Sequence, residues 1–118
     1  MYNPTIVAHF SNPKHSGELP NANQELKIGN SVCGDTIFLK LRIVQEKVED
    51  AKFTAYGCAT SLATADIFAD YIIGKQLSEI IATPVAIREA MLGELEPPQM
   101  HCLHILHELF TQLEQVAV

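Results

Sequence analysis

Tyr56-Gly57-Cys58-Ala59-Thr60-Ser61 joins two kinds of hydrophobic pattern, because the residues before it alternate like a strand and those after it repeat like a helix. Cys58 is therefore predicted at a strand-to-helix junction. Gly57 has no Cβ and can adopt the backbone angles of a tight turn, while the free N–H groups of the following helix point back towards the thiol. Such surroundings favour the thiolate, the form of cysteine that binds metals or attacks sulfur.

Alternating apolar residues predict three strands before this junction. The alternation is weak from Leu26 to Val32, clean from Ile37 to Val44, and clear again from Val48 to Tyr56. The connections at Cys33-Gly34-Asp35 and Gln45-Glu46-Lys47 are short, so we expect an antiparallel meander. The first connection presents Cys33 and Asp35, whereas the second is charged and solvated.

Helical spacing predicts the other elements. Asn3 and Pro4 are a predicted cap and first residue of a short amphipathic N-terminal helix, with Ile6, Val7 and Phe10 at helical spacing behind them. After the junction, apolar residues recur at intervals of three and four until a glycine at position 74 closes the helix.

Two short helices and one longer helix complete the chain. Ser78 and Thr83-Pro84 are predicted to open the short helices, and Gly93 to end the second. The last helix is predicted from about Met100, with an apolar stripe formed by Cys102, Ile105, Leu106, Leu109 and Leu113. The predicted fold class is α+β, with a three-stranded antiparallel sheet packed against several helices.

Composition limits the function. The 118 residues are 47% hydrophobic, which predicts one compact domain over residues 1–118. The formal charge of −6 and only 8 scattered Lys and Arg residues argue against nucleic-acid binding and suggest basic protein partners or none.

No segment reads as a signal peptide or a membrane span, so we expect no membrane association and a cytoplasmic location. There the three cysteines are expected to be reduced, which favours metal binding or thiol chemistry over a disulfide.

Each candidate site residue also has a simpler role when it is taken singly. Cys102 lies in line with the apolar stripe, where buried free cysteine is common. His101 is more often a surface or capping residue, and Asp35 is typical of a turn. His104 and His107 fall on the polar side of the last helix and are predicted to be solvated, with at most adventitious metal binding.

The shared position of the three cysteines favours a common site. All lie in predicted loops or first helical turns, where side chains can converge at one end of a domain. Three sulfurs and one oxygen or nitrogen suit tetrahedral zinc, and four ligands are also what a two-iron cluster needs. The candidate ligands are Cys33, Asp35, Cys58, His101 and Cys102.

Four motifs along the chain resemble those of one known protein family. His9-Phe10-Ser11-Asn12-Pro13-Lys14 is similar to the opening aromatic-x-Asn-Pro-Arg or Lys segment of that family. Cys33-Gly34-Asp35 and Tyr56-Gly57-Cys58 match its Cys-Gly-Asp and Tyr-Gly-Cys motifs. Pro97-Pro98 followed by His101-Cys102 resembles its Pro-Pro-to-His-Cys region. Together these motifs resemble the iron-sulfur cluster assembly scaffolds of the IscU and NifU N-terminal type, and the likeness runs nearly from end to end.

The resemblance implies a ligand set and partners. In the family, the three cysteines and the aspartate, with the histidine as an alternative or auxiliary ligand, hold a nascent [2Fe-2S] cluster or a zinc ion in its place. Carried over residue by residue, these ligands are Cys33, Asp35, Cys58, Cys102 and His101. The last cysteine is also implicated in taking persulfide sulfur from a cysteine desulfurase, which assigns Cys102 that role. The other implied partners are apo-proteins that accept the cluster.

One segment departs from the family pattern. Glu96-Pro97-Pro98-Gln99-Met100 stands where the family usually has Leu-Pro-Pro-Val-Lys-Ile, the docking site of a dedicated chaperone. Loss of that leucine and lysine weakens the case for such a chaperone as a partner. Ala59 also replaces a common glycine.

Three hypotheses follow. The first is a scaffold, not an enzyme in the turnover sense, that assembles a labile cluster and passes it to apo-proteins. The second is a zinc-dependent sulfur-transfer partner like the SufU-type relatives; those carry an insertion before the final cysteine and lack the preceding histidine, whereas this chain has His101 and no insertion. The third is a structural zinc domain that would unfold when its metal is removed.

Overall fold

The computed structural model describes residues 3–30, 35–57 and 59–117. Within them the fold is α+β, as predicted. The elements in chain order are α1 (Pro4–Ser11), β1 (Gln24–Asn30), β2 (Asp35–Val44), β3 (Lys47–Tyr56), α2 (Ala59–Ile72), α3 (Leu77–Ile81), α4 (Val85–Ala90), the 3-10 helix η1 (Pro97–Gln99) and α5 (His101–Ala117).

The three strands form the predicted antiparallel meander in the order β1-β2-β3. Leu39 is the register partner of Leu26 on β1 and of Phe53 on β3. The β2–β3 connection turns through Gln45 and Glu46, whose φ angles of 52° and 64° are those of a two-residue hairpin turn that follows the strand twist.

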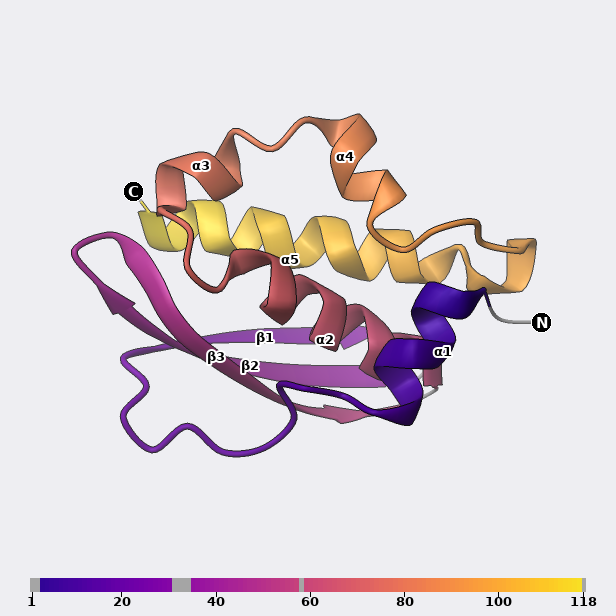
Figure 1. The fold of residues 1–118 in the computed structure, drawn as a ribbon, viewed down its shortest axis with the longest axis horizontal. Helices are drawn as coiled ribbons and strands as arrows, with labels where there is room; N and C mark the ends of the chain where they lie inside the picture. Colours follow the sequence, from indigo (N-terminus) through magenta and orange to yellow (C-terminus); the bar gives the residue numbers. More distant parts are fainter. Residues whose placement is uncertain (1–2, 31–34, 58, 118) are drawn as a thin grey trace.

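The core lies between one face of the sheet and the helices. Figure 1 shows α1, α2 and α5 on this face, with no helix among the described residues on the other. On β2, Ile37, Leu39 and Leu41 are buried beneath the helices, whereas the residues between them are partly exposed. On α5, the predicted stripe of Cys102, Ile105, Leu106, Leu109 and Leu113 is buried throughout. The side chains that alternate along β2 and those that recur at helical spacing along α5 are therefore buried in the same core.

Both edges of the sheet make contacts beyond the three strands. At β3, the N–H of Phe53 donates to His15 O (2.8 Å) and the N–H of Gly17 donates to Phe53 O (3.0 Å). At β1, the side chain of Gln112 pairs with the backbone of Lys27: its Oε1 accepts from the N–H (3.2 Å) and its Nε2 donates to the carbonyl (2.7 Å). Residues 15–17 and one glutamine on α5 thus occupy hydrogen-bonding groups that edge strands leave open.

The short helices differ in detail from the sequence prediction. On α1, Asn3 caps the helix as predicted, and its side chain accepts from the N–H of Ile6, but Val7 and Phe10 are 45% and 47% exposed. α3 begins at Leu77 after Gln76, not at Ser78, because the Gln76 N–H donates to the Glu79 carboxylate.

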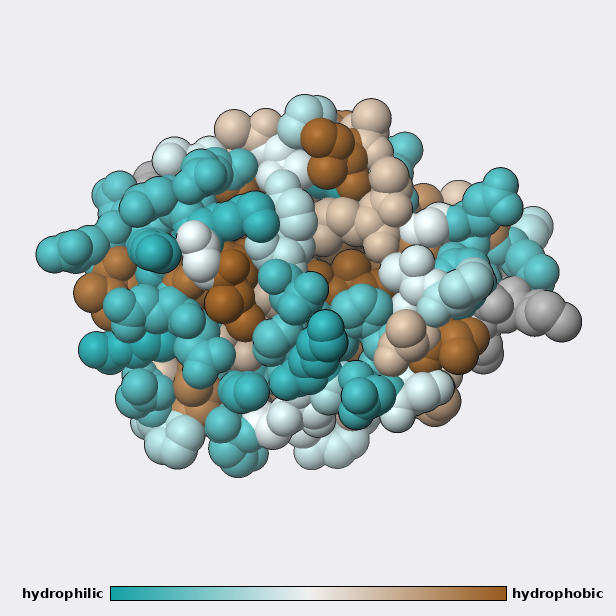
Figure 2. Space-filling view, in the orientation of Figure 1, coloured by the Kyte–Doolittle hydropathy of each residue, from teal (hydrophilic) through white to brown (hydrophobic). Residues whose placement is uncertain are grey.

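α4 packs loosely. It has no buried residue, and apolar side chains lie at the surface over it (Figure 2). In the part of the chain that the structure describes, no helix is both long and apolar enough to cross a membrane.

Candidate metal and cluster site

Three elements that begin at or directly after predicted ligands in the sequence start at the same end of the molecule. Figure 1 shows the start of β2, the start of α2 and the start of α5 at the end where the N-terminus lies. Asp35 is the first residue of β2, Ala59 the first of α2 and His101 the first of α5. The meander and the two long helices thus bring together positions that are far apart in sequence.

The junction before α2 has the predicted form on both sides of Cys58. Gly57 has a φ of 140°, which L side chains rarely adopt, and α2 begins at Ala59. Thr60 and Ser61 in the first turn are buried. Cys58 itself, like Cys33, lies outside the described residues, and of Asp35 only the backbone is described, opposite Asn30.

His101 and Cys102 form the described half of the candidate site. Cys102 is fully buried and belongs to the hydrophobic core, while His101 is half-buried. The Cys102 Sγ lies 3.9 Å from the His101 Nε2, so a thiol and an imidazole face each other at the start of α5. The structural role of Cys102 and its predicted role as a ligand are therefore compatible: the residue packs in the stripe and sits at the helix end.

No group of three or more metal-binding side chains converges within the ranges 3–30, 35–57 and 59–117. His104 is exposed and His107 half-buried on the outer side of α5. The predicted ligand set of Cys33, Asp35, Cys58, His101 and Cys102 thus stays a prediction.

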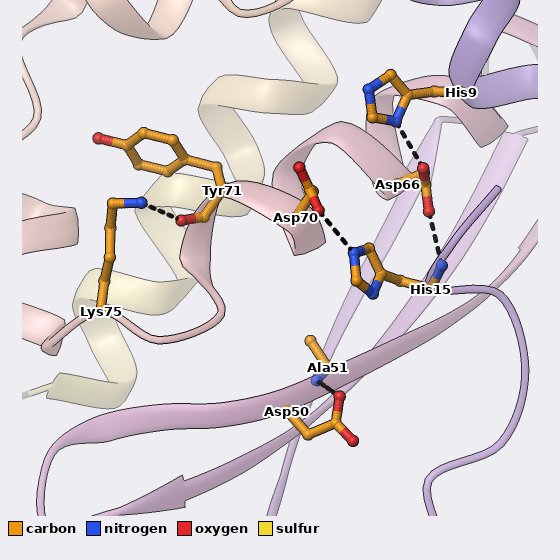
Figure 3. A network of polar contacts seen from close by, with 8 residues as sticks. All are labelled: His9, His15, Asp50, Ala51, Asp66, Asp70, Tyr71 and Lys75. Atoms are coloured by element: carbon orange, nitrogen blue, oxygen red, sulfur yellow. Dashed lines mark hydrogen bonds and ion pairs between the residues drawn. The ribbon is translucent and has the colours of Figure 1, made fainter.

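A buried carboxylate ties three segments together beside this site. Asp66 of α2 is fully buried; it accepts a hydrogen bond from His9 Nδ1 (2.6 Å) of α1 and another from the N–H of His15 (2.8 Å) (Figure 3). His15 also contacts Asp70, one turn further along α2, through Nε2 (2.9 Å). A buried carboxylate is costly unless it is paired, so these contacts fix α1 and residues 15–17 on α2.

The charges around Asp70 favour its ionised form. The hydrogen bond from His15 is the largest of the causes and lowers the pKa of the Asp70 carboxyl below its ordinary value of 3.8. Burial opposes it, and the weaker electrostatic interactions with His15, Lys14 and His9 each lower the pKa further. The Asp70 side chain is half exposed, and solvent screens this pair more than it screens the buried Asp66.

The sequence prediction did not single out Asp66, although a signal was present. Asp66 stands in the run Thr64-Ala65-Asp66-Ile67-Phe68, in which the remaining four residues are apolar or small. A charged residue there needs buried partners. Its partners come from positions 57 and 51 residues away, so helical periodicity could not name them.

Comparison with known proteins identifies the family. The family model described as the NifU-like N terminal domain matches residues 1–112. The chain belongs to this family. The NifU-like domain is 34% identical over 106 residues to the iron-sulfur cluster assembly scaffold protein IscU 1 of Archaeoglobus fulgidus, with 89% of this chain and 69% of that protein covered. It is 30% identical over 106 residues to the IscU scaffold protein of Escherichia coli K12, with 86% and 81% covered.

Solved structures show the same fold. A putative iron-sulfur cluster assembly scaffold protein for the SUF system from Fervidobacterium islandicum is similar at a TM-score of 0.68 and 24% identity, with 96% of the NifU-like domain and 93% of that chain covered. A NifU-like protein from Brucella abortus gives a TM-score of 0.64 at 19% identity, with 94% and 84% covered. The predicted resemblance and fold class are confirmed.

Proposed function

We propose that this NifU-like domain is an iron-sulfur cluster assembly scaffold, which assembles a labile [2Fe-2S] cluster and passes it to apo-proteins. The proposal is supported by membership in the family and by identities of 30% or more to proteins named IscU scaffolds. In this function the cluster is cargo, and the protein is a carrier, not an enzyme with turnover.

The observation that carries the proposal is the position of His101 and Cys102. Their side chains meet at the first turn of α5, at the end where β2 and α2 also begin. The proposed ligands are Cys33, Cys58 and Cys102, with either Asp35 or His101 as the fourth. Thiolates are soft ligands that suit iron-sulfur clusters, and the same set would hold zinc.

Sulfur would arrive as persulfide on a cysteine desulfurase. The Cys102 thiolate attacks the outer sulfur of that persulfide, a new S–S bond forms on Cys102, the old S–S bond breaks, and the desulfurase cysteine leaves as a thiolate. Cys102 is fully buried, so this step requires a movement that exposes its sulfur at the start of α5. The partner that delivers sulfur therefore has to engage this end of the molecule.

Anaerobic reconstitution tests the function. Incubation of the purified protein with ferrous iron and sulfide should develop the visible absorption of a [2Fe-2S] cluster, with matching iron and acid-labile sulfide contents. A protein that holds only zinc and never develops this absorption would contradict the proposal. Such a protein would be a zinc-dependent sulfur-transfer partner if it stimulates a cysteine desulfurase, and a structural zinc domain if metal removal unfolds it.

A further inference from the structure

The face of the sheet that the helices leave open gathers cations. Residues that alternate with the buried ones point to this outer face, and register places them side by side: Lys40 lies between Glu25 and Lys52, and Arg42 lies opposite Asp50. Lys27 lies opposite Phe38 in the next row. The four cations Lys27, Lys40, Arg42 and Lys52 are half of the 8 Lys and Arg residues of a chain whose net charge is −6.

The arrangement of these cations does not serve the stability of the sheet. Lys40 and Lys52 are direct cross-strand partners, and like charges in this position are destabilising. Lys40 contacts Glu18 at 3.5 Å, at the margin of a cavity of about 460 Å³ between residues 18–25 and this face. For Lys52, the part of the chain that the structure describes shows no ion pair. A lysine pair of this kind is better explained by an external anion.

An aromatic cluster lies on the same face, towards the end of the molecule where β2, α2 and α5 begin. The Phe38 and Tyr56 rings meet edge to face with centroids 6.4 Å apart, and Lys27 Nζ lies 5.5 Å from the Phe38 centroid. Tyr56 is 62% exposed and stands two residues before Cys58. An exposed aromatic centre with lysines around it has the composition of a protein interface, where tyrosine is enriched among residues that dominate binding.

We propose that the outer sheet face, defined by Lys27, Phe38, Lys40, Lys52 and Tyr56, is the docking surface for an acidic acceptor protein. The proposal rests on the proposed function, because docking beside Tyr56 would place the acceptor at the end where the cluster is assembled. Charge complementarity identifies the occupant: this face has more cations than anions, whereas the whole chain is acidic. An acidic partner is repelled by the remaining surface and is thus guided to this face.

A nucleic acid fits this face less well. Its phosphates need a continuous track of cations, but Glu25 and Asp50 interrupt the rows and Glu18 engages Lys40. Arg42 also donates to the carbonyl of Asn21 at 3.3 Å. Carboxylates of a protein, which can be placed one by one against Lys27 and Lys52, match the spacing better.

A charge-matched pair of double variants tests the surface. Lys27→Glu with Lys52→Glu reverses two cations of the outer face, whereas Lys14→Glu with Lys75→Glu makes the same change in net charge at two lysines away from this face, one in the segment before residues 15–17 and one in the segment that follows α2. The probe is a plant-type apo-ferredoxin, an acidic acceptor. Its dissociation constant with the metal-free protein is measured by calorimetry in low and high salt, and cluster transfer is then followed with the reconstituted proteins.

The surface is supported if the first double variant weakens ferredoxin binding by about tenfold or more in low salt, the second by no more than about twofold, and high salt reduces the difference. Equal losses in both variants would overturn it. So would tighter binding of a fluorescent oligothymidine than of the ferredoxin. The binding measurement needs no cluster, so failure of reconstitution would contradict the proposed function while this surface is still tested.

Discussion

His9 and Asp66 stand 57 positions apart in the chain, yet the Nδ1 of His9 lies 2.6 Å from a carboxylate oxygen that is fully buried in α2. The second oxygen of Asp66 accepts from the backbone of His15. One carboxylate therefore joins α1, the segment at residues 15–17 and the helix whose first turn follows Cys58.

Asp66→Ala should lower the free energy of unfolding strongly. The substitution leaves the His9 ring and the His15 N–H without their acceptor in a buried place, a loss on the order of 3 kcal/mol. Asp66→Asn keeps one oxygen acceptor and should lose less. Urea unfolding followed by circular dichroism measures both. Asp70→Ala is the matched control, because its half-exposed side chain should contribute less than about 1 kcal/mol; an equal loss at both positions would contradict this account.

Stability in acid should report on Asp70. Its folded-state pKa is lowered, so its contribution is fully present above the ordinary value of 3.8 and is lost as pH falls through the lower pKa of the folded state. Asp70→Asn should therefore destabilise the protein at pH near 5, and this loss of unfolding free energy should shrink as the pH falls below 3.8. A difference in unfolding free energy that does not shrink in acid would show that the carboxylate contributes by another route.

Cys58, which precedes α2 in the sequence, and Cys102, in the first turn of α5, should respond differently to substitution by serine. Cys58→Ser should abolish stable cluster binding and leave the fold, because the position is a junction. Cys102→Ser should cost stability as well, on the order of 1 to 3 kcal/mol if the hydroxyl finds no partner in the core. Thermal unfolding of the two metal-free variants is the measurement, and equal melting temperatures would refute the distinction.

Asp35→Ala should give a cluster that lasts longer and is transferred more slowly. Soft sulfur holds cluster iron better than hard oxygen, so the aspartate leaves one iron easier for an acceptor thiolate to claim, and His101 can take its place. The checks are the decay of cluster absorbance and the rate of transfer to an apo-ferredoxin, with wild type beside the variant. Faster decay would oppose the proposal, and joint loss of cluster and fold stability would show that Asp35 mainly shapes the turn.

Local patterns in the sequence were sufficient to predict the main strands and the long helices of the fold. Alternation located β2 and β3, and the helical stripe that includes Cys102 located α5, because both periods report directly on which side chains are buried. The same reasoning expected Val7 and Phe10 of α1 to behave as part of an apolar face, but they are largely exposed. The short helix meets the core mainly through Ile6, so only that one of its three larger apolar side chains is buried.

Contacts between distant segments could not be predicted in this way. The partners of Asp66 depend on how α1 and residues 15–17 pack on α2. The cations at Lys27, Lys40 and Lys52 look scattered in sequence, and only the strand register shows that they lie in adjacent rows. A count of charges therefore indicated basic partners or none, whereas the geometry favours an acidic one.

The hydrogen bonds of Gln112 to Lys27 and of residues 15–17 to Phe53 have a further consequence. A strand edge with unpaired peptide groups is a template on which other chains can add, and such growth ends in aggregates. In this protein a side-chain amide occupies one edge at Lys27, and a short piece of the chain's own backbone occupies the other at Phe53. The part of the outer sheet face that residues 18–25 leave open can thus bind other proteins while edge-to-edge polymerisation is disfavoured. Such partners bind through side chains and can dissociate again.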